Sequence, residues 1–265
     1  MLRVTILGCG GSGGVPLLGG AEELGEWGDC DPAEPRNQRG RTSALVEGPG
    51  GGRLLIDAGP DLRRQLLAAR AARLDAVLFT HGHADHIMGI DDLRQVNRVT
   101  GRALEAIGTR TTLQKLDDRF DYAFIGATPP FFFRPALTAR SLAYGEQIET
   151  AGLSLRVFRQ DHGVMDSLGV RIGRFAYSTD VVSLPEDSLS ALEGLDTWVV
   201  GCFQRAPHKV HASLGQVFEW VERLKPRRTV LTHMGNSMDY QSLLRELPAG
   251  IEPGFDGMVL DVEAT

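Results

Sequence analysis

The chain has 265 residues, of which 42% are hydrophobic and 23% charged, and its formal net charge is -6. This length suits one large α/β domain with a well-buried core, and we expect a single domain over residues 1–265. The negative charge provides no basic field for nucleic acid, so a nucleic-acid substrate is disfavoured. No segment approaches the roughly 18 consecutive apolar residues of a membrane helix, so no membrane partner is expected.

The start of the chain and its cysteines predict a soluble cytoplasmic protein. The first apolar stretch, from Leu2 to Gly8, is too short for the core of a secretory signal peptide, and Gly-rich sequence follows at once. The three cysteines, Cys9, Cys30 and Cys202, are odd in number and far apart, which favours reduced thiols over a disulfide framework.

The first third of the chain alternates short apolar runs with Gly-rich turns. The Gly-rich loop at 9–16 lacks the spacing of a nucleotide-binding fingerprint. Residues 19–41, rich in Gly, Pro and charge, predict a long irregular segment. Strands are predicted at 3–7, 42–47 and 53–56, the last two as a hairpin, and a helix is predicted at 62–73.

Residues 81–86, His-Gly-His-Ala-Asp-His, hold four candidate metal ligands in six positions. They follow the apolar run 75–80, and a helical stretch is predicted from Ile87. This order predicts a metal-binding loop at the end of a buried strand.

The rest of the chain continues the alternation of strands and helices. Helices are predicted at 110–118, 212–224 and 239–246, and strands at 131–133, 153–159, 168–172, 197–202, 229–232 and 258–262. Strands in both halves with helices between them predict one α/β sandwich.

Three further candidate ligands each follow an apolar strand: His162, Asp180 and His233. A lone residue of this kind is more often a hydrogen-bonded turn residue or a helix cap. Taken together with residues 81–86 they predict a common site, because strand ends gather along one edge of a sandwich. His81 and His83 can face one ion, Asp85 and His86 a second, and Asp180 can bridge the two ions with its two oxygens.

In these residues the chain resembles the metallo-β-lactamase superfamily of binuclear hydrolases. The resemblance lies in Asp57-Ala58-Gly59, Thr80 to His86, His162, Ser178-Thr179-Asp180 and Thr232-His233. It implies a four-layer αβ/βα sandwich in which Asp57 supports a metal ligand. The ligands it implies are His81, His83 and His162 for one metal and Asp85, His86 and His233 for the other, with Asp180 shared.

A narrower resemblance is to the phosphoribosyl cyclic phosphodiesterases of the carbon-phosphorus lyase pathway. It rests on the opening Gly-rich loop, Trp27-Gly28, His211 and residues 254–258. It implies cleavage of a phosphodiester, a homodimer, and His211 as a phosphate contact or general acid. Members of that subgroup carry an extra zinc on a cysteine cluster and a histidine. Here only Cys30 and, near the last ligand, Asn236 stand in those places, so no third metal is expected.

We therefore expect a metal-dependent hydrolase with two divalent ions, Zn, Mn or Fe, because imidazole and carboxylate ligands suit all three. Two ions about 3.5 to 4 Å apart can activate a bridging water toward a phosphodiester. The predicted substrate is a small cyclic or nucleotide-like phosphodiester, with Asp85 and His211 as catalytic residues. A thioester or lactone hydrolase and a non-catalytic binding protein are the alternatives. The sequence leaves open whether His208 or His211 contacts the substrate.

Overall fold

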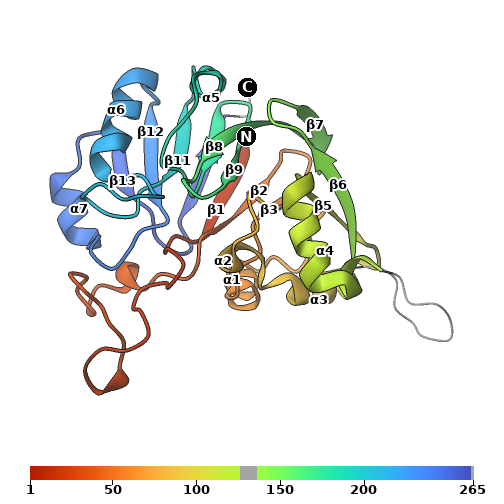
Figure 1. Cartoon of the computed structure of the whole chain (residues 1–265), viewed down its shortest axis with the longest axis horizontal. Coiled ribbons are helices and arrows are strands. Elements are labelled where there is room, and N and C mark those ends of the chain that lie inside the picture. Colours follow the sequence, from red (N-terminus) through yellow and green to blue (C-terminus); the bar gives the residue numbers. More distant parts are fainter. Residues whose placement is uncertain (126–135, 264–265) are drawn as a thin grey trace.

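Two seven-stranded β-sheets form the framework of the computed structural model, which describes residues 1–125 and 136–263 (Figure 1). The first sheet has the strand order β14-β1-β2-β3-β4-β5-β6 and the second β13-β12-β11-β10-β9-β8-β7. Strand β1 pairs antiparallel with β14, with Leu2 opposite Val262, so the two ends of the chain lie close together.

The first sheet and its helices come mainly from the first half of the chain. Its strands are β1 (Leu2–Gly8), β2 (Ser43–Glu47), β3 (Arg53–Ile56), β4 (Ala76–Leu78), β5 (Leu104–Thr109), β6 (Leu137–Leu142) and β14 (Val259–Val262). Its helices are α1 (Leu62–Ala68), α2 (Ala84–Ile87), α3 (Ile90–Thr100) and α4 (Arg110–Phe124).

The second sheet is built from the second half of the chain. Its strands are β7 (Gln147–Thr150), β8 (Leu153–Asp161), β9 (Asp166–Ile172), β10 (Phe175–Ser178), β11 (Thr197–Gly201), β12 (Arg228–Thr232) and β13 (Ile251–Pro253). Its helices are α5 (Glu186–Ala191), α6 (Leu214–Leu224) and α7 (Tyr240–Glu246).

Alternation of side chains along the strands explains the four layers. Leu2, Val4 and Ile6 of β1 point into the core that the first sheet shares with the second. Leu7, with neighbours on β2 and β3, faces the opposite way, into a core beneath α1, α3 and α4. The helices therefore lie outside the paired sheets (Figure 1), and the expected αβ/βα sandwich is confirmed.

Most predicted elements are present, with shifted ends. The helix predicted at 62–73 ends at Ala68, because Arg70 takes a left-handed conformation (φ 53°) and the N–H of Ala71 bonds the carbonyl of Leu66 at 2.9 Å. The helical stretch predicted from Ile87 begins earlier, at Ala84, and is interrupted at Gly89. The strand predicted at 131–133 lies outside the described residues.

The irregular segment predicted at 19–41 is irregular apart from two short 3-10 turns, Ala21–Glu23 and Pro35–Asn37. Its end is held against the second sheet by the buried guanidinium of Arg39, which donates to the carbonyl of Gly235 at 3.1 Å. Asn37 adds a hydrogen bond to the Asp239 carboxylate at 2.7 Å. Among the described residues, no helix is both long and apolar enough to cross a membrane.

Candidate metal centre

The strands that carry the predicted ligands end at one edge of the sandwich. Strands β10, β11 and β12 are parallel, and β8 runs in the same direction because two antiparallel pairings separate it from β10. His162, Asp180 and His233 follow the ends of β8, β10 and β12. In the first sheet, Asp57 follows β3 and the loop at residues 81–86, here named the histidine loop, follows the parallel strand β4.

Hydrogen bonds to the buried carboxylate of Asp57 hold the histidine loop in place. Asp57 accepts from the backbone N–H and from the hydroxyl of Thr80, both at 2.8 Å. It also accepts from Nδ1 of His86 at 2.7 Å, which leaves Nε2 of His86 as the free ring nitrogen. The loop is therefore anchored at both of its ends.

One group of four ligand atoms is formed by His81, His83, His162 and Asp180. Nδ1 of His83 lies 3.0 Å from Nε2 of His81 and 3.3 Å from Nε2 of His162. Oδ1 of Asp180 lies 3.4 Å from Nε2 of His162 and 3.9 Å from Nε2 of His81. Ligands about 2.0 to 2.1 Å from a tetrahedral metal ion lie roughly 3.3 Å apart, so these separations fit a single ion.

A second group is formed by Asp85, His86 and His233. Nε2 of His86 lies 3.2 Å from Oδ2 of Asp85, and Nε2 of His233 lies 3.7 Å from the same oxygen. The other oxygen of Asp180, Oδ2, lies 3.0 Å from Nε2 of His86 and 3.2 Å from Nε2 of His233. Asp180 thus presents one carboxylate oxygen to each group.

The charges of the cluster favour an ionised Asp180. Its side chain is only 2% exposed. Although burial acts in the opposite direction, His233, His86 and His81 hold the pKa of Asp180 well below its usual value. Burial, with His86 second, lowers the pKa of His81, so its imidazole is neutral at pH 7. Although burial acts in the opposite direction, Asp180, Asp57 and Asp85 raise the pKa of His86 well above its usual value. A buried carboxylate among imidazoles is the donor set of a metal site.

Unsatisfied atoms in the cluster fit the same interpretation. Nε2 of His86 and both ring nitrogens of His233 are buried and have no hydrogen-bond partner. A buried polar atom without a partner costs about 1 to 3 kcal/mol, so it needs a reason. Coordination of a divalent ion by the two Nε2 atoms would satisfy them. The residues present therefore fit metal ions.

Three strand ends in the cluster have a left-handed backbone without being glycine. Asp57, Asp180 and His233 have φ values of 60°, 51° and 54°. For residues with a Cβ this conformation costs roughly 1 to 2 kcal/mol, although Asp and His tolerate it better than most. At each position the chain turns sharply out of its strand, and the side chain lies at the shared edge.

His211 lies at the opening of the cluster, in the segment between β11 and α6. Its Nδ1 is 3.7 Å from Oδ1 of Asp180, and its ring centroid is 4.7 Å from that of His233. Its side chain is 15% exposed. Burial and then His233 lower its pKa to about 3. His208 stacks on the ring of His211, with centroids 5.2 Å apart, and also contacts Phe203.

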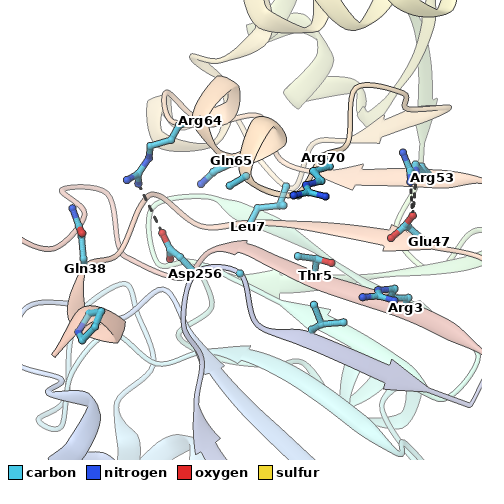
Figure 2. A pocket seen from close by; sticks show the side chains of 15 residues that line it. Arg3, Thr5, Leu7, Gln38, Glu47, Arg53, Arg64, Gln65, Arg70 and Asp256 are labelled. Atoms are coloured by element: carbon cyan, nitrogen blue, oxygen red, sulfur yellow. Dashed lines mark hydrogen bonds and ion pairs between the residues drawn. The ribbon is translucent and has the colours of Figure 1, made fainter.

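A cavity of about 850 Å³ lies elsewhere, on the outer face of β1 beside α1 (Figure 2). Four arginines line it, but carboxylates balance most of their charge. Arg53 pairs with Glu47 at 2.8 Å, and Arg64 faces Asp256 at 3.9 Å (Figure 2). Arg3 lies in register between Glu47 and Asp261. This is a ladder of alternating charges on an open sheet face, and it contains none of the predicted ligands.

The roles of the Thr80 hydroxyl and of the Val210 carbonyl in the site were not predicted from the sequence. The Thr80 hydroxyl lies 3.0 Å from Nδ1 of His81, and the carbonyl of Val210 accepts from Nδ1 of His162 at 2.7 Å. Both contacts leave the Nε2 atom of the histidine facing the cluster. The position of Thr80, between the strand and the first histidine, was the available signal. Nothing in the sequence marked Val210, because its contribution is a backbone carbonyl.

Cys30 and Asn236, which stand where the resembling subgroup has zinc ligands, lie in two segments that are held together by protein contacts. Cys30 is buried, and its sulfur lies 3.9 Å from Nη1 of Arg39. Gly28 packs so closely on Asn236 that a Cβ would lie 2.7 Å from the Asn236 carbonyl oxygen. The Arg39 guanidinium connects these two segments.

The four-layer sandwich and its edge cluster of imidazoles and carboxylates define a metal-dependent hydrolase of the metallo-β-lactamase kind. The family model described as "Beta-lactamase superfamily domain" matches residues 52–234. The chain belongs to this superfamily.

Several individual proteins are similar to this chain. The crystal structure of a diphosphatase from the PhnP family is 32% identical and has a TM-score of 0.86, covering 98% of this chain and 96% of that one. The anti-Pycsar protein Apyc1 of Bacillus phage 010DV004 is 30% identical over 74% of this chain and 83% of its own length. A Porphyromonas gingivalis protein named octanoyltransferase is 31% identical over 97% of this chain, which spans only 51% of that relative.

Proposed function

We propose that the chain is a binuclear metal-dependent phosphodiesterase that cleaves a small cyclic or nucleotide-like phosphodiester. The observation that carries the proposal is the carboxylate of Asp180, whose two oxygens face two separate groups of ligand atoms. The similarity to a diphosphatase at a TM-score of 0.86 supports chemistry at phosphorus.

In this proposal His81, His83 and His162 hold one ion, Asp85, His86 and His233 hold the other, and Asp180 is shared. Imidazole and carboxylate donors suit Zn, Mn or Fe. Two such ions, when bound, lower the pKa of a shared water toward neutrality and stabilise negative charge on the phosphoryl oxygens.

The protein residues supply orientation and proton transfer. Asp85, whose side chain is 13% exposed, is more open to solvent than Asp180 and can accept a hydrogen bond from the attacking water. His211 lies at the opening, and because its pKa is lowered to about 3 its neutral ring can donate a hydrogen bond to the phosphate. His208 supports the ring of His211 by stacking.

The test is hydrolysis of bis-p-nitrophenyl phosphate by protein whose metal content is measured by mass spectrometry. We expect two divalent ions per chain, turnover with Mn or Zn, and loss of turnover in Asp85→Ala. Asp91→Ala, which removes a carboxylate that is 65% exposed on α3, is the matched control and should keep full activity.

Two outcomes would contradict the proposal. Fully metallated protein that hydrolyses no phosphodiester but cleaves a thioester or a lactone would identify the other hydrolase. Metallated protein without any turnover would favour a non-catalytic binding protein. A cytoplasmic homodimer stays a prediction, and light scattering after gel filtration checks its oligomeric part.

A further inference from the structure

A cavity of about 210 Å³ adjoins the histidine loop on the side of α4. Four segments line it: the histidine loop with Gly82, the first turns of α4 with Lys115, the β6–β7 turn with Tyr144, and the region of the β8–β9 turn with Met165. The backbone N–H of His162, a proposed metal ligand, bonds the carbonyl of Met165 at 2.9 Å. The cavity therefore touches segments that carry proposed ligands from both sheets.

The side chain of Lys115 lies across the histidine loop at Gly82, which has no side chain to block it. A Cβ at Gly82 would lie 2.7 Å from Cδ of Lys115, so the aliphatic part of the lysine packs directly on this glycine. Its ammonium nitrogen lies 4.0 Å from the sulfur of Met165. Within the described part of the chain, no ion pair involves Lys115. A half-buried cation is thus held beside the cluster without a carboxylate partner.

The start of α4 also favours an anion at this cavity, and the carboxylate in the lining is paired with an arginine. The side chain of Thr109 caps α4 by accepting from the N–H of Thr112 at 3.1 Å, and the N–H groups of Arg110 and Thr111 have no acceptor within the helix. Asp166 is the carboxylate among the lining residues, and Arg159 bonds it at 2.9 Å. Tyr144 adds a phenol at the rim.

We propose that this cavity, named the Lys115 pocket, binds a second anionic group of the substrate, a phosphoryl or a carboxylate, while the scissile phosphodiester lies at the metal ions. This inference rests on the proposed function. A volume of about 210 Å³ accommodates one such group with a short linker, and Lys115 with the first turn of α4 supplies its donors. Lys115 is then a specificity-determining residue.

The first experiment compares p-nitrophenyl propyl phosphate with p-nitrophenyl 3-phosphopropyl phosphate, which differ only in a terminal phosphate. We expect the native chain to prefer the second substrate in kcat/KM. Lys115→Met keeps an unbranched side chain on Gly82 but removes the charge. It should lower kcat/KM for the second substrate about 10- to 100-fold, as for a lost hydrogen bond to a charged group, and leave the first unchanged.

The matched control is Arg119→Met, one turn further along α4. It removes the same charge from the same helix, from a side chain that is exposed and does not line the pocket. Equal losses in the two variants, or equal effects of Lys115→Met on both substrates, would overturn the proposal. Circular dichroism and metal content, expected to be native in both variants, exclude misfolding as the cause.

The second experiment does not depend on turnover. The chain has only three lysines, Lys115, Lys209 and Lys225, so acylation of each can be followed by mass spectrometry. In metal-loaded protein, propane-1,3-bisphosphonate should slow acylation of Lys115 about tenfold or more, whereas propylphosphonate should not. Lys225, exposed at the end of α6, is the internal reference.

The two proposals fail in different ways. Protection of Lys115 by the bisphosphonate alone, without hydrolysis of any phosphodiester, would remove the phosphodiesterase and retain the pocket. Hydrolysis of bis-p-nitrophenyl phosphate with equal acylation of Lys115 under both phosphonates would retain the phosphodiesterase and remove the pocket.

Discussion

The two sheets contribute to the cluster in different ways. The first sheet supplies four candidate ligands from one short loop after β4, held by the carboxylate of Asp57. The second sheet supplies His162, Asp180 and His233 from the ends of three separate strands. The first set is positioned by local hydrogen bonds, whereas the second is positioned only when the whole sheet has formed.

Because of this difference, the site is sensitive to changes in either sheet. Each group of candidate ligands contains residues from both sheets, and Asp180 of the second sheet presents one carboxylate oxygen to each group. The histidine loop alone therefore completes neither group. Substitutions in either sheet and removal of metal test this dependence.

Asp180→Asn should have the largest effect. The amide keeps the size of the side chain but removes the charge that faces His233, His86 and His81. We expect hydrolysis of bis-p-nitrophenyl phosphate to fall roughly 1,000-fold or more, because a preorganised charge at the reacting centre is lost. Mass spectrometry should find fewer than two ions per chain. Asp196→Asn is the control, because Asp196 lies just before β11, at the end of that strand away from the cluster. An equal loss of hydrolysis in this variant would contradict the prediction.

Removal of metal should loosen the connection between the sheets. Ions that bind only the folded chain stabilise it by about 2.7 kcal/mol at a concentration 100 times Kd. For a chain of this size that corresponds to a rise in Tm of roughly 5 to 10 °C. Thermal unfolding with and without a chelator measures the shift. Asp180→Asn should show a much smaller shift in Tm. A chelator that removes the metal without changing Tm would contradict the prediction that the ions connect the two sheets.

Asp57→Asn tests the anchoring of the histidine loop. The amide nitrogen of Asn, unlike a carboxylate oxygen, cannot accept a hydrogen bond from Nδ1 of His86. His86 would then favour the tautomer with its proton on Nε2, the nitrogen proposed to bind metal. We expect metal affinity to fall about 10- to 100-fold, as for other groups that orient a ligand. Competition with a fluorescent chelator measures it. Asp75→Asn, just before β4, should bind metal normally.

Asp239→Asn tests the hydrogen bonds that hold the irregular segment at residues 19–41 against the second sheet. Although burial acts in the opposite direction, hydrogen bonds from Asn37 and from the N–H of Ser242 lower the pKa of Asp239 to about 2. A pKa below the unfolded value of about 3.9 means that the ionised carboxylate stabilises the folded state above that pH. This stabilisation is lost as the pH falls toward 2.

The variant should therefore lower the free energy of unfolding by about 2 kcal/mol at pH 7. The difference from the native chain should shrink between pH 4 and pH 3, which urea unfolding at several pH values would measure. A difference that does not change over this range would exclude the carboxylate as its source.

The candidate ligands could be proposed from the sequence because each sits at a recognisable junction. The histidine loop is dense in ligand types, and His162, Asp180 and His233 each end an apolar run. Strand direction then brings them to one edge, as the parallel order of β10, β11 and β12 shows. The assignment of ligands to metals still rests on the proposal.

Other parts were not predicted, for physical reasons. Strands β6 and β7 carry several exposed polar side chains, so they lack the apolar runs that marked the other strands. Helix α2 was placed too late because Asp85 and His86 belong to its only turn, where ligand types hide the helical pattern. Lys115 gave no signal, since its place over Gly82 depends on how α4 packs.

The left-handed backbone at Asp57, Asp180 and His233 implies a trade-off between stability and function. Glycine adopts this conformation freely, whereas alanine does not. In the absence of metal, the Asp180→Gly protein should unfold at a higher temperature than the Asp180→Ala protein. Neither variant has a carboxylate at position 180 to offer to two ions. Evolution toward a more stable chain would thus run against the residues that give this edge its chemistry.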